Sequence, residues 1–588
     1  MVRIMDKKVS LGGNVWEILP VDENLCVRLA ETCNVSQTVA RILCLRGIGI
    51  EQAENFLHPK IQNLMPNPTV MKDMDKTAER ITKAIEQKEQ IAIIGDYDVD
   101  GATSTSILVR FFRQVGIEPL IHIPSREEGY GPSDLAFKEF KTGGATLVLT
   151  IDCGTTAFEV LNRAAEEFDI IVIDHHEAEA ILPKVYAVVN PKRLDDDNQY
   201  PYLQYMSAVG VGFMVLVAVN RLLRQHGFYT DKNEPNLLNL LDLVALGTVC
   251  DVVPLLGLNR AYVRQGLKIM AKMQNVGLRQ LMKVLNMQEA PTVYHLGYVI
   301  GPRINACGRV GDARMGSMLL CSENELEAQV LAEKFNQFNI ERKEIENFVL
   351  LEAIEQVEKQ AQEYPMAFAY GYDWHQGVIG IVAGKLKERY NVPAFVMSVE
   401  PDEVKGSARS INGIDLGALI ISAKEKGVIT GGGGHIMAAG FSLKEEQIPE
   451  FKKFAGEYIL ERLGAEKITP VLNIDCVLSL SAINEQLVEE LSVLEPYGTG
   501  NAEPQIMVRD VCISWAQIVG NGHVKCTLCS ALGHKLPAIA FQAADTQIGQ
   551  AMLQNSGEVF DVAGYLRCDS WQGKKRIQMI INDIMRKS

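Results

Sequence analysis

Apolar and polar positions follow a regular alternation of helix and strand patterns between residues 75 and 174. Short apolar runs with strand character are separated by segments whose apolar residues recur with the period of a helix. The pattern predicts, in order, helix 75–87, strand 90–95, helix 103–115, strand 119–123, helix 133–141, strand 146–151, helix 156–167 and strand 170–174. Regular alternation of this kind indicates a parallel sheet with helices on both faces.

The pattern changes several times elsewhere, which predicts a multidomain α/β protein. Residues 1–74 hold short helical patterns (36–46 and 50–57) and are expected to form an N-terminal cap. The sheet domain takes residues 75–320, and its part from 206 to 285 is largely helical. A long helical connector spans 321–362, and a second α/β unit spans 363–465. Residues 466–588 hold short alternating strands, which are typical of a small oligonucleotide-binding barrel (OB-fold).

Composition and charge are those of an ordinary globular chain. Its 588 residues are too many for one core, and apolar residues make up 47%. No apolar run is long enough to span a bilayer and no secretory signal is evident, so we expect a cytoplasmic protein without a membrane partner. The net charge of −15 argues against indiscriminate coating of nucleic acid, although it permits a locally basic groove. The 12 cysteines favour reduced thiols, and for the lone CxxC of Cys526 and Cys529 coincidence is preferred over zinc or redox use.

Metal-type ligands follow the apolar runs of the sheet domain. One acid after a strand is routinely a helix cap, but repeated acids and a histidine pair on one rim of a parallel sheet indicate a metal centre. Mixed carboxylate and imidazole ligands suit Mn²⁺, or Mg²⁺, while zinc stays open by ligand type. Ions that share a carboxylate would support hydrolysis of a phosphorus ester or anhydride. The residues concerned are Asp96, Asp98, Asp100, Asp152, Asp174, His175, His176, Asp242 and Asp251, the last two assigned to the end of a further apolar strand.

Two further motifs carry groups that suit phosphate. In GPRINACGR, Arg303 and Asn305 are expected to follow a tight Gly-Pro turn, and Arg309 follows another glycine; an ion pair with a core acid is the alternative for the arginines. In the second α/β unit, a glycine run lets backbone N–H groups approach a phosphate closely, with polar side chains around it. The binding residues expected there are Ser407, Arg409, Gly432, Gly433 and His435.

The ordered motifs GDYDVDG, DCG, DHH and GTVCDVVPL resemble those of the DHH phosphoesterase superfamily. GPRINACGR, GSARS, GGGGHIMAAG and EPYGTGNAEP are similar to its RecJ branch of bacterial single-stranded-DNA exonucleases, and the glycine-run unit resembles the DHHA1 substrate-binding domain. The resemblance implies that Asp98, Asp152, His175 and Asp251 hold one divalent ion, with Asp96 and the shared Asp152 facing a second. His176 then meets the scissile phosphate, and Asp100 and Arg303 are assigned with it to the catalytic group.

One ligand known in some members of the superfamily is missing. They place a histidine shortly before the first aspartate, where this chain has Ala92, Ile93 and Ile94. One of the metal sites is therefore expected to fill weakly, or only once substrate phosphate contributes an oxygen.

The resemblance also implies a substrate and partners. It implies 5′-to-3′ hydrolysis of single-stranded DNA to mononucleotides in DNA repair and recombination, across a cleft between the DHH and DHHA1 domains. A monomer is expected, with a single-strand-binding protein and a helicase as candidate partners. Two alternatives stay open: a phosphodiesterase for short oligonucleotides, cyclic dinucleotides or pyrophosphate, and a non-catalytic replication scaffold. The C-terminal barrel argues against the first and the intact acids and histidines against the second.

Overall fold

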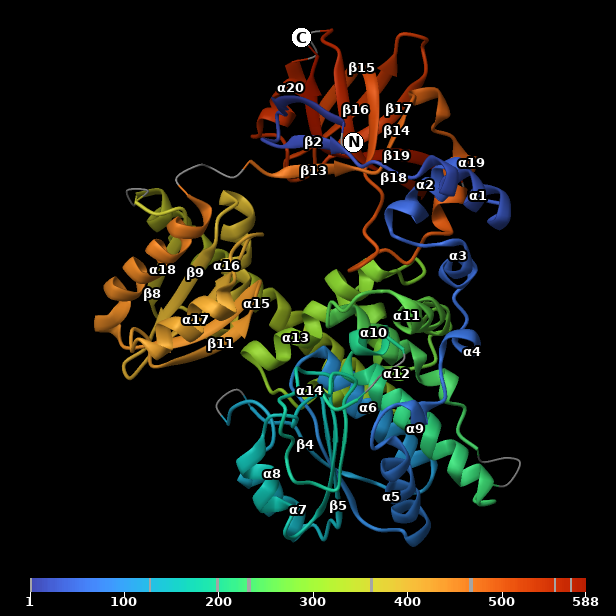
Figure 1. The fold of residues 1–588 in the computed structure, drawn as a ribbon, viewed down its shortest axis with the longest axis vertical. Helices are drawn as coiled ribbons and strands as arrows, with labels where there is room; N and C mark the ends of the chain where they lie inside the picture. Colours follow the sequence, from blue (N-terminus) through green and yellow to red (C-terminus); the bar gives the residue numbers. More distant parts are fainter. Residues whose placement is uncertain are drawn as a thin grey trace. The chain divides into compact units, whose positions relative to one another are not determined.

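The computed structural model describes residues 3–125, 128–196, 200–229, 234–359, 363–464, 469–554, 557–571 and 574–587. The chain forms two compact units (Figure 1). Unit 1 comprises Met1–Pro302, Ala313–Ala332 and Val471–Ser588, and unit 2 comprises Arg303–Asp312 and Glu333–Pro470. The chain passes between the units four times: within helix α13 (Gly301–Val310), after Asp312, within helix α15 (Glu325–Lys359) and after Pro470.

A parallel sheet positions the predicted metal ligands in unit 1. It is 5-stranded in the order β4-β3-β5-β6-β7, and every neighbouring pair is parallel. The predicted strands and helices are confirmed, with ends that differ by a few residues. They are α5 (Met74–Gln87), β3 (Ile91–Ile94), α6 (Val99–Gln114), β4 (Leu120–His122), α7 (Asp134–Thr142), β5 (Leu147–Ile151), α8 (Phe158–Ala164), β6 (Asp169–Ile173) and β7 (Ala187–Val189). The chain leaves β3 for β4 on one side and then returns to β5 on the other, which makes the gap between β3 and β5 a topological switch point.

The segment after the sheet is helical, as expected. Its elements are η2 (Leu203–Tyr205), α9 (Ala208–Gln225), η3 (Leu237–Leu240), α10 (Leu241–Cys250), α11 (Gly257–Met270), α12 (Val276–Val284), the π-helix η4 (His295–Ile300) and α14 (Met315–Cys321). The assignment of Leu241–Cys250 to a strand is wrong: it is the buried helix α10, whose all-round apolar character hides the helical period. Helix α9 is long and apolar enough to cross a membrane by length and composition, but 72% of it is buried inside the fold.

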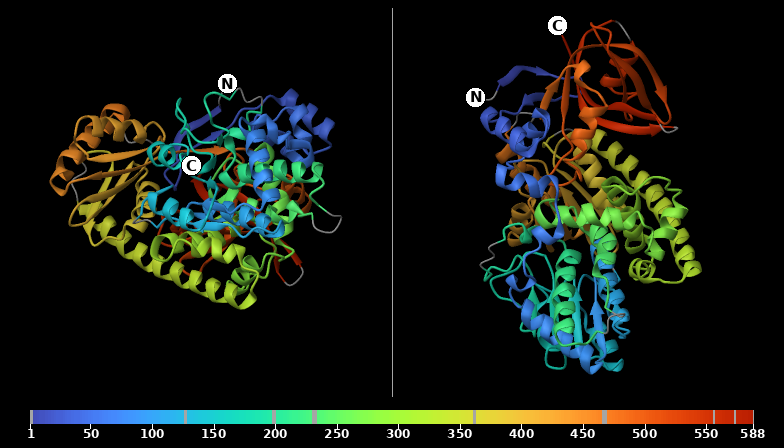
Figure 2. Two further views of the ribbon diagram at one scale, coloured as in Figure 1. Left: turned by 90° about the horizontal axis from the view of Figure 1, so that it is seen from below. Right: turned by 90° about the vertical axis from the view of Figure 1, so that its right-hand side faces the viewer.

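The N-terminal segment and the C-terminal barrel share one core. Strand β1 (Arg3–Val9) pairs with β2 (Val15–Ile18), which pairs in parallel with β13 (Val471–Ile474) (Figures 1 and 2). Helices α1 (Glu23–Cys33), α2 (Gln37–Leu45) and α3 (Ile50–Leu57) pack into the same apolar cluster as the barrel, and α4 (Ile61–Leu64) and η1 (Pro68–Val70) follow them. The barrel closes through the order β15-β16-β17-β19-β18 and the pairing of β15 with β18. Its elements are β14 (Cys476–Leu478), η6 (Leu480–Ala482), α19 (Glu485–Ser492), β15 (Ile506–Val519), β16 (His523–Ser530), β17 (Lys535–Ala540), α20 (Gln547–Gln554), β18 (Phe560–Trp571) and β19 (Lys574–Arg586).

Asp583 fastens the N-terminal segment to the barrel. Its side chain is fully buried on β19 and accepts hydrogen bonds from Trp16 Nε1 at 2.9 Å, the Gly12 amide at 2.8 Å and Asn14 Nδ2 at 2.8 Å. A buried carboxylate is tolerated only when donors surround it, so this residue ties the two ends of the chain together. The predicted domain boundaries, which separate 1–74 from 466–588, stay a prediction.

The loop before the barrel docks onto the segment that follows α10. Arg260 on α11 donates to the carbonyl oxygens of Leu494, Glu495 and Pro496, at 2.9, 2.8 and 3.1 Å. The Leu255 amide donates to the Thr499 carbonyl at 2.8 Å. The EPYGTGN part of the sequence motif is therefore a connection between the barrel and the helices of unit 1.

Unit 2 is a second sheet with helices against it. Its order is β11-β12-β10-β9-β8, built from β8 (Ala367–Tyr372), α16 (Gln376–Tyr390), β9 (Ala394–Val399), β10 (Val404–Arg409), α17 (Leu416–Glu425), β11 (Gly431–His435), β12 (Ala438–Leu443), η5 (Glu445–Gln447) and α18 (Ile448–Leu463). The expected tight turn at Gly301-Pro302 is wrong. Both residues lie in the first turn of α13, where proline is tolerated because its missing N–H has no helical partner. All 12 cysteines are free, as expected.

Replacing Asp583 by Asn tests the junction of the two chain ends. The variant keeps the shape but loses the charge that organises the donors, so we expect about 2–4 kcal/mol less stability. Urea unfolding followed by tryptophan fluorescence measures this loss. Asp510→Asn, which removes an exposed carboxylate paired with Lys587, is the matched control. Equal unfolding midpoints for both variants would contradict the role given to Asp583.

Candidate metal centre

The acids that follow β3 and β5 meet at the switch point between these two strands. Asp98 caps α6 by accepting the Gly101 amide at 3.0 Å, and Asp96, Asp98 and Asp152 bring ligand atoms within 4.8 Å of one another. Asp152 directly follows β5 and has φ 63°, a left-handed conformation that an aspartate adopts rarely. Such strain is held in place by its surroundings and is typical of functional positions.

His175 joins this group to the other ligands. Its Nε2 lies 3.2 Å from Asp152 Oδ1 and its Nδ1 lies 3.6 Å from Asp251 Oδ2. Asp251 is the C-terminal cap residue of α10, so its position comes from a helix end and not from a strand end. Asp242, the other acid of that segment, lies at the start of α10 and is absent from the ligand groups found among the described residues.

Asp174 sets the orientation of the histidine pair. Its Oδ1 accepts the amide of His175 at 2.7 Å and the ring Nδ1 of His176 at 2.7 Å, and its Oδ2 accepts the Thr155 amide at 3.0 Å. Burial alone would raise the pKa of Asp174, yet the hydrogen bonds from His176 and Thr155 hold it well below its usual range. Asp174 therefore stays ionised and fixes the ring of His176.

Sequence reasoning missed two residues beside the histidines. Tyr130 donates its hydroxyl to the Asp152 carbonyl at 2.9 Å and packs edge-on against the His176 ring. Asn190, directly after β7, donates to the His176 carbonyl at 2.9 Å and to Thr155 Oγ1 at 2.9 Å. A polar residue after the short apolar run 187–189 was the available signal for Asn190, and glycines on both sides of Tyr130 were a weaker one.

Asp100 faces the cluster but is also part of the fold. Its carboxylate oxygens accept the amides of Ala208 at 2.6 Å and Val209 at 3.0 Å, at the first turn of α9. A carboxylate at a helix N-terminus satisfies amides that have no partner within the helix. Asp100 also shares a ligand group with His175 and Asp251, so it links the metal centre to the start of α9. Its assignment to the catalytic group stays a prediction.

Crowding of buried carboxylates dominates the electrostatics. Burial, and next the neighbouring Asp100, raise the pKa of Asp152 well above its usual range. Burial also raises the pKa of Asp100 to about 7, and the charge of Asp251 is the next cause. The pKa of Asp251 is likewise raised to about 7 by burial and next by the charge of Asp98. Burial lowers the pKa of His175, which favours the neutral imidazole that binds metals. For His176 burial alone would lower the pKa, but the hydrogen bond and charge of Asp174, together with the charges of Asp251 and Asp96, raise it to about 8.

The residues present fit a divalent cation. Among the described residues, His175 Nδ1 and Asp251 Oδ2 are buried polar atoms without a hydrogen-bond partner, as expected of ligand atoms. Carboxylate oxygens with one or two imidazoles are a donor set for Mn²⁺ or Mg²⁺. Strand β3 is fully buried and carries no histidine, so the ligand that some superfamily members place there has no counterpart in it.

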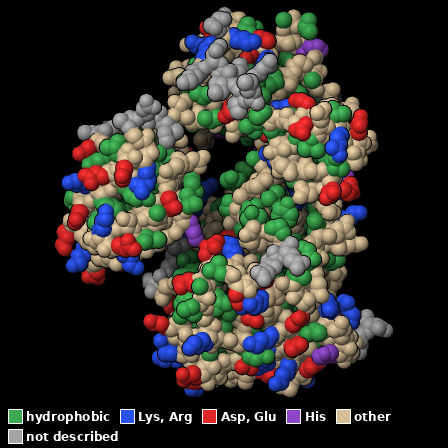
Figure 3. All heavy atoms as spheres, in the orientation of Figure 1, with side chains coloured by type: hydrophobic (Ala, Val, Ile, Leu, Met, Phe, Trp, Pro, Cys, Tyr) green, Lys and Arg blue, Asp and Glu red, His purple; other side chains and the backbone are tan. Residues whose placement is uncertain are grey.

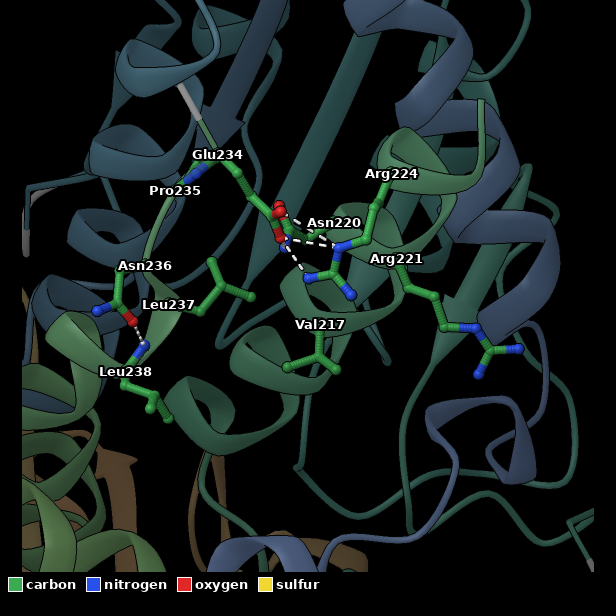
Figure 4. A pocket seen from close by; sticks show the side chains of 9 residues that line it. All are labelled: Val217, Asn220, Arg221, Arg224, Glu234, Pro235, Asn236, Leu237 and Leu238. Carbon is green, nitrogen blue, oxygen red and sulfur yellow. Dashed lines mark hydrogen bonds and ion pairs between the residues drawn. The ribbon is translucent and has the colours of Figure 1, made fainter. Parts of the chain in front are cut away.

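One pocket in unit 1 lies away from the metal centre. It has a volume of about 500 Å³, and the Arg224–Glu234 ion pair crosses it (Figure 4). It begins at Val217, roughly 13 Å further along α9 than the residues that contact Asp100. It is therefore separate from the metal centre. Its lining consists of Val217, Asn220, Arg221, Arg224, Glu234, Pro235, Asn236, Leu237 and Leu238.

In unit 2 the residues of the glycine-run motifs share one face of a sheet. Two cross-strand rows form this face, Ser407–Gly440–Gly433 and Arg409–Ala438–His435. Residues two apart on a strand lie on the same side of a sheet. The small residues Ala438 and Gly440 of β12 therefore form a small-residue floor, a shallow surface between the polar side chains of β10 and β11. Strand β11 is at the sheet edge, so alternate backbone N–H groups of the run are not used by the sheet. Gly432 has φ 148°, and a Cβ there would lie 2.8 Å from the Gly440 carbonyl oxygen.

Arg409 is half-buried on this face. Its Nη1 donates to Ser407 Oγ at 3.2 Å and to the Ala408 carbonyl at 2.9 Å, and no carboxylate pairs with it among the described residues. Burial lowers its pKa, although a guanidinium stays charged at neutral pH. A Cβ at Gly380 of α16 would lie 3.1 Å from both Ser407 Oγ and Arg409 Nη2. Glycine at this position therefore leaves room beside the Ser407 and Arg409 side chains. The face thus presents a cation beside small residues and backbone donors.

The arginines of GPRINACGR lie on α13 within unit 2. Arg309 donates to the Gly377 carbonyl at the start of α16, and Arg303 Nε donates to Asn336 Oδ1 at 3.1 Å. Burial, and next the nearby Arg342, lower the pKa of Arg303. The assignment of both arginines to the substrate, like that of Asn305, stays a prediction, and an ion pair with a core acid stays the alternative.

The fold and site define a metal-dependent phosphoesterase of the DHH class. Residues 90–248 match the DHH family, N-terminal domain, residues 363–461 match the DHHA1 domain, and residues 474–583 match the RecJ OB domain.

Known proteins narrow this class further. The single-stranded-DNA-specific exonuclease RecJ of Bacillus subtilis is 33% identical over 97% of this chain and 70% of its own length. The Escherichia coli RecJ is 33% identical over 91% of this chain and 94% of its own length. The crystal structure of RecJ in complex with Mn²⁺ from Thermus thermophilus matches with a TM-score of 0.80 at 27% identity, covering 97% of this chain and 80% of that one, and the Mg²⁺ complex matches with a TM-score of 0.74. The chain belongs to the RecJ family of single-stranded-DNA-specific exonucleases.

Asp152→Asn tests the metal centre. Asparagine tolerates the left-handed backbone but removes the charge of the proposed shared ligand. Loss of residues that only support a metal ligand typically costs 10–100-fold, so we expect turnover and Mn²⁺ affinity to fall by about 100-fold or more. We also expect the metal-free variant to be more heat-stable than the metal-free wild type, because one buried repulsion is gone. Calorimetric Mn²⁺ titration and thermal melts measure both effects, with the exposed Asp134→Asn as control. Unchanged Mn²⁺ affinity would contradict the assignment.

Proposed function

We propose that the protein is a metal-dependent exonuclease that hydrolyses single-stranded DNA from its 5′ end and releases mononucleotides. The observation that carries this proposal is a carboxylate and histidine cluster at the switch point of a parallel sheet, in a chain that also carries an OB barrel. Membership of the RecJ family supports the substrate class and, by resemblance, the direction of cutting.

The residues have distinct proposed roles in hydrolysis. Asp98, Asp152, His175 and Asp251 would hold one divalent ion, and Asp96 with Asp152 a second. Such ions, when bound, lower the pKa of water and offset charge on phosphoryl oxygens. The pKa of His176, raised to about 8, keeps the ring protonated at neutral pH. With Nδ1 held by Asp174, the Nε2 proton is available to a non-bridging phosphate oxygen.

The Arg409 face of unit 2 is proposed to bind the terminal 5′ phosphate. A terminal phosphate carries more negative charge than an internal diester, and charge-assisted hydrogen bonds favour it. Support comes from the half-buried guanidinium and from the small-residue floor between Ser407 and His435. Recognition of a terminus would make the enzyme an exonuclease and prevent cutting within a strand.

The OB barrel favours long single strands over the alternative substrates. Short oligonucleotides and cyclic dinucleotides need no barrel of this kind, and a scaffold would not need to keep all six of the acids and histidines assigned to the metals and the phosphate. Phe541 and Trp515 are exposed on the barrel and suit stacking on bases, whereas the side chains of Trp571, Lys574 and Lys575 lie outside the described residues. By the same resemblance we infer a monomer that acts in DNA repair and recombination in the cytoplasm, with a single-strand-binding protein and a helicase as partners.

The substrate class is tested with end-labelled DNA. Single strands, duplexes, dinucleotides and cyclic dinucleotides are incubated with the protein in Mn²⁺ and, separately, in Mg²⁺. The proposal expects rapid loss of label from the 5′ end of single strands, with mononucleotides as the first product. Faster turnover of dinucleotides than of long strands, or release from the 3′ end first, would contradict it.

Arg409→Ala tests recognition of the terminal phosphate. We expect the wild type to degrade a 5′-phosphorylated strand faster than its 5′-hydroxyl twin, and the variant to lose most of that preference while it still binds Mn²⁺. Charge-assisted hydrogen bonds of about 1.5–3 kcal/mol predict a preference on the order of 10- to 100-fold. Arg389→Ala, which removes an exposed arginine paired with Glu358, should keep the preference. A variant that still discriminates the two strands would rule this face out.

A further inference from the structure

Tyr294, directly before η4, and Tyr298, within η4, form an exposed stacked pair. The side chains of Tyr294 and Tyr298 are 53% and 74% exposed, and their rings stack with centroids 5.5 Å apart and planes 23° from parallel. Figure 3 shows hydrophobic side chains gathered on the surface over the region that Figure 1 labels α10 and α11. Two exposed rings that stack on each other offer a flat aromatic surface to a partner outside the chain.

The pair belongs to a segment that is bonded to the helix carrying a proposed metal ligand. Cys250, at the end of α10, donates its thiol to the Leu296 carbonyl at 3.4 Å, and a Cβ at Gly301 would lie 2.5 Å from Cys250 Sγ. The next residue after Cys250 is Asp251. Helix η4 is a π-helix, a rare conformation that is frequent at functional sites. Its rings are therefore anchored against the end of the helix that delivers Asp251 to the cluster.

A tyrosine of the barrel, Tyr565, lies within electrostatic range of Tyr298. Tyr565 of β18 has Arg567 at 5.1 Å over its ring, and Arg567 also pairs with Glu503 at 3.6 Å. Burial raises the pKa of Tyr565, and the Tyr298 phenol is among the neighbours that contribute to that shift. Gly498, in the loop before the barrel, is close to Val293, the residue before Tyr294: a Cβ at Gly498 would lie 4.0 Å from Val293 Cγ1. The tyrosine pair thus lies between the barrel and the metal-bearing helix, within unit 1.

We propose that Tyr294 and Tyr298 are a stacking platform for consecutive nucleobases of the strand that enters the metal centre, and that Tyr565 with Arg567 extends it on the barrel. This inference rests on the proposed function. Every base offers a π-face, so stacking tolerates any sequence, and it requires bases that are not paired in a duplex. The platform would therefore contribute to selection of single strands, whereas the metal ligands contact only the phosphate backbone.

The test compares ring loss in the protein with base loss in the DNA. The double variant Tyr294→Leu/Tyr298→Leu keeps apolar bulk but has no π-face, and Tyr294→Phe/Tyr298→Phe keeps the rings. Stacking of about 1–3 kcal/mol per base predicts at least roughly 10-fold weaker binding of an oligothymidylate to the leucine variant, and near wild-type binding to the phenylalanine variant. Tyr372→Leu, at an exposed tyrosine of unit 2, is the matched control.

Strands with abasic sites supply the second arm. Abasic nucleotides moved stepwise from the 5′ end should weaken binding to the wild type at particular positions, and at those positions the leucine variant should show no further loss. Turnover of a saturating short strand should stay within a few-fold of wild type, because the metal ligands are untouched. If the wild type degrades single strands while the leucine variant binds them equally well, or while abasic sites weaken both proteins alike, the platform is overturned. A wild type that degrades no strand would instead refute the proposed function.

Discussion

Mutual repulsion of buried carboxylates is the constraint on which this structure depends. Asp96, Asp152 and Asp100 are almost completely removed from water, and Asp98 and Asp251 lie beside them. Buried acids without a counter-charge would hold protons, as the raised pKa values of Asp100, Asp152 and Asp251 show. Divalent cations remove the repulsion and are the ligands that the RecJ structures of Thermus thermophilus contain. The cluster is therefore expensive in stability without metal and suited to phosphate chemistry with it.

The rest of unit 1 holds this unfavourable cluster together. The parallel sheet brings the ends of β3, β5 and β6 to one edge. Asp174 holds both histidines by hydrogen bonds to the His175 amide and the His176 ring. Asp100 ties the cluster to α9, while Asp251 depends on the end of α10. The segment after Asp251 is bonded to the loop before the barrel through Leu255 and Arg260. The barrel consequently has a structural connection to the metal centre in addition to its proposed contact with DNA.

Local patterns predicted the sheet, the acids and histidines that cluster at its edge, and the barrel strands because each depends on residues close in sequence. The acids of GDYDVDG and the DHH run are visible as polar residues after apolar strands, and the structure places them together. Three features needed tertiary information. Helix α10 looked like a strand because it is buried all round, the Gly301-Pro302 pair begins a helix instead of a turn, and Asp583 binds residues more than 560 positions away. Tyr130 and Asn190 were missed because their roles arise from contacts with residues distant in the sequence, His176 among them.

Proton release on metal binding tests the central claim most directly. EDTA-treated full-length protein is titrated with Mn²⁺ in two buffers of different ionisation enthalpy, from about pH 8 to about pH 6.5. Because the metal-free carboxylates have pKa values near 7, the account predicts that Mn²⁺ displaces protons and that the release grows as the pH falls through this range. The release should be much smaller in Asp152→Asn. Mn²⁺ binding that releases no protons at any of these pH values would contradict a buried, mutually repelling carboxylate cluster as the metal centre.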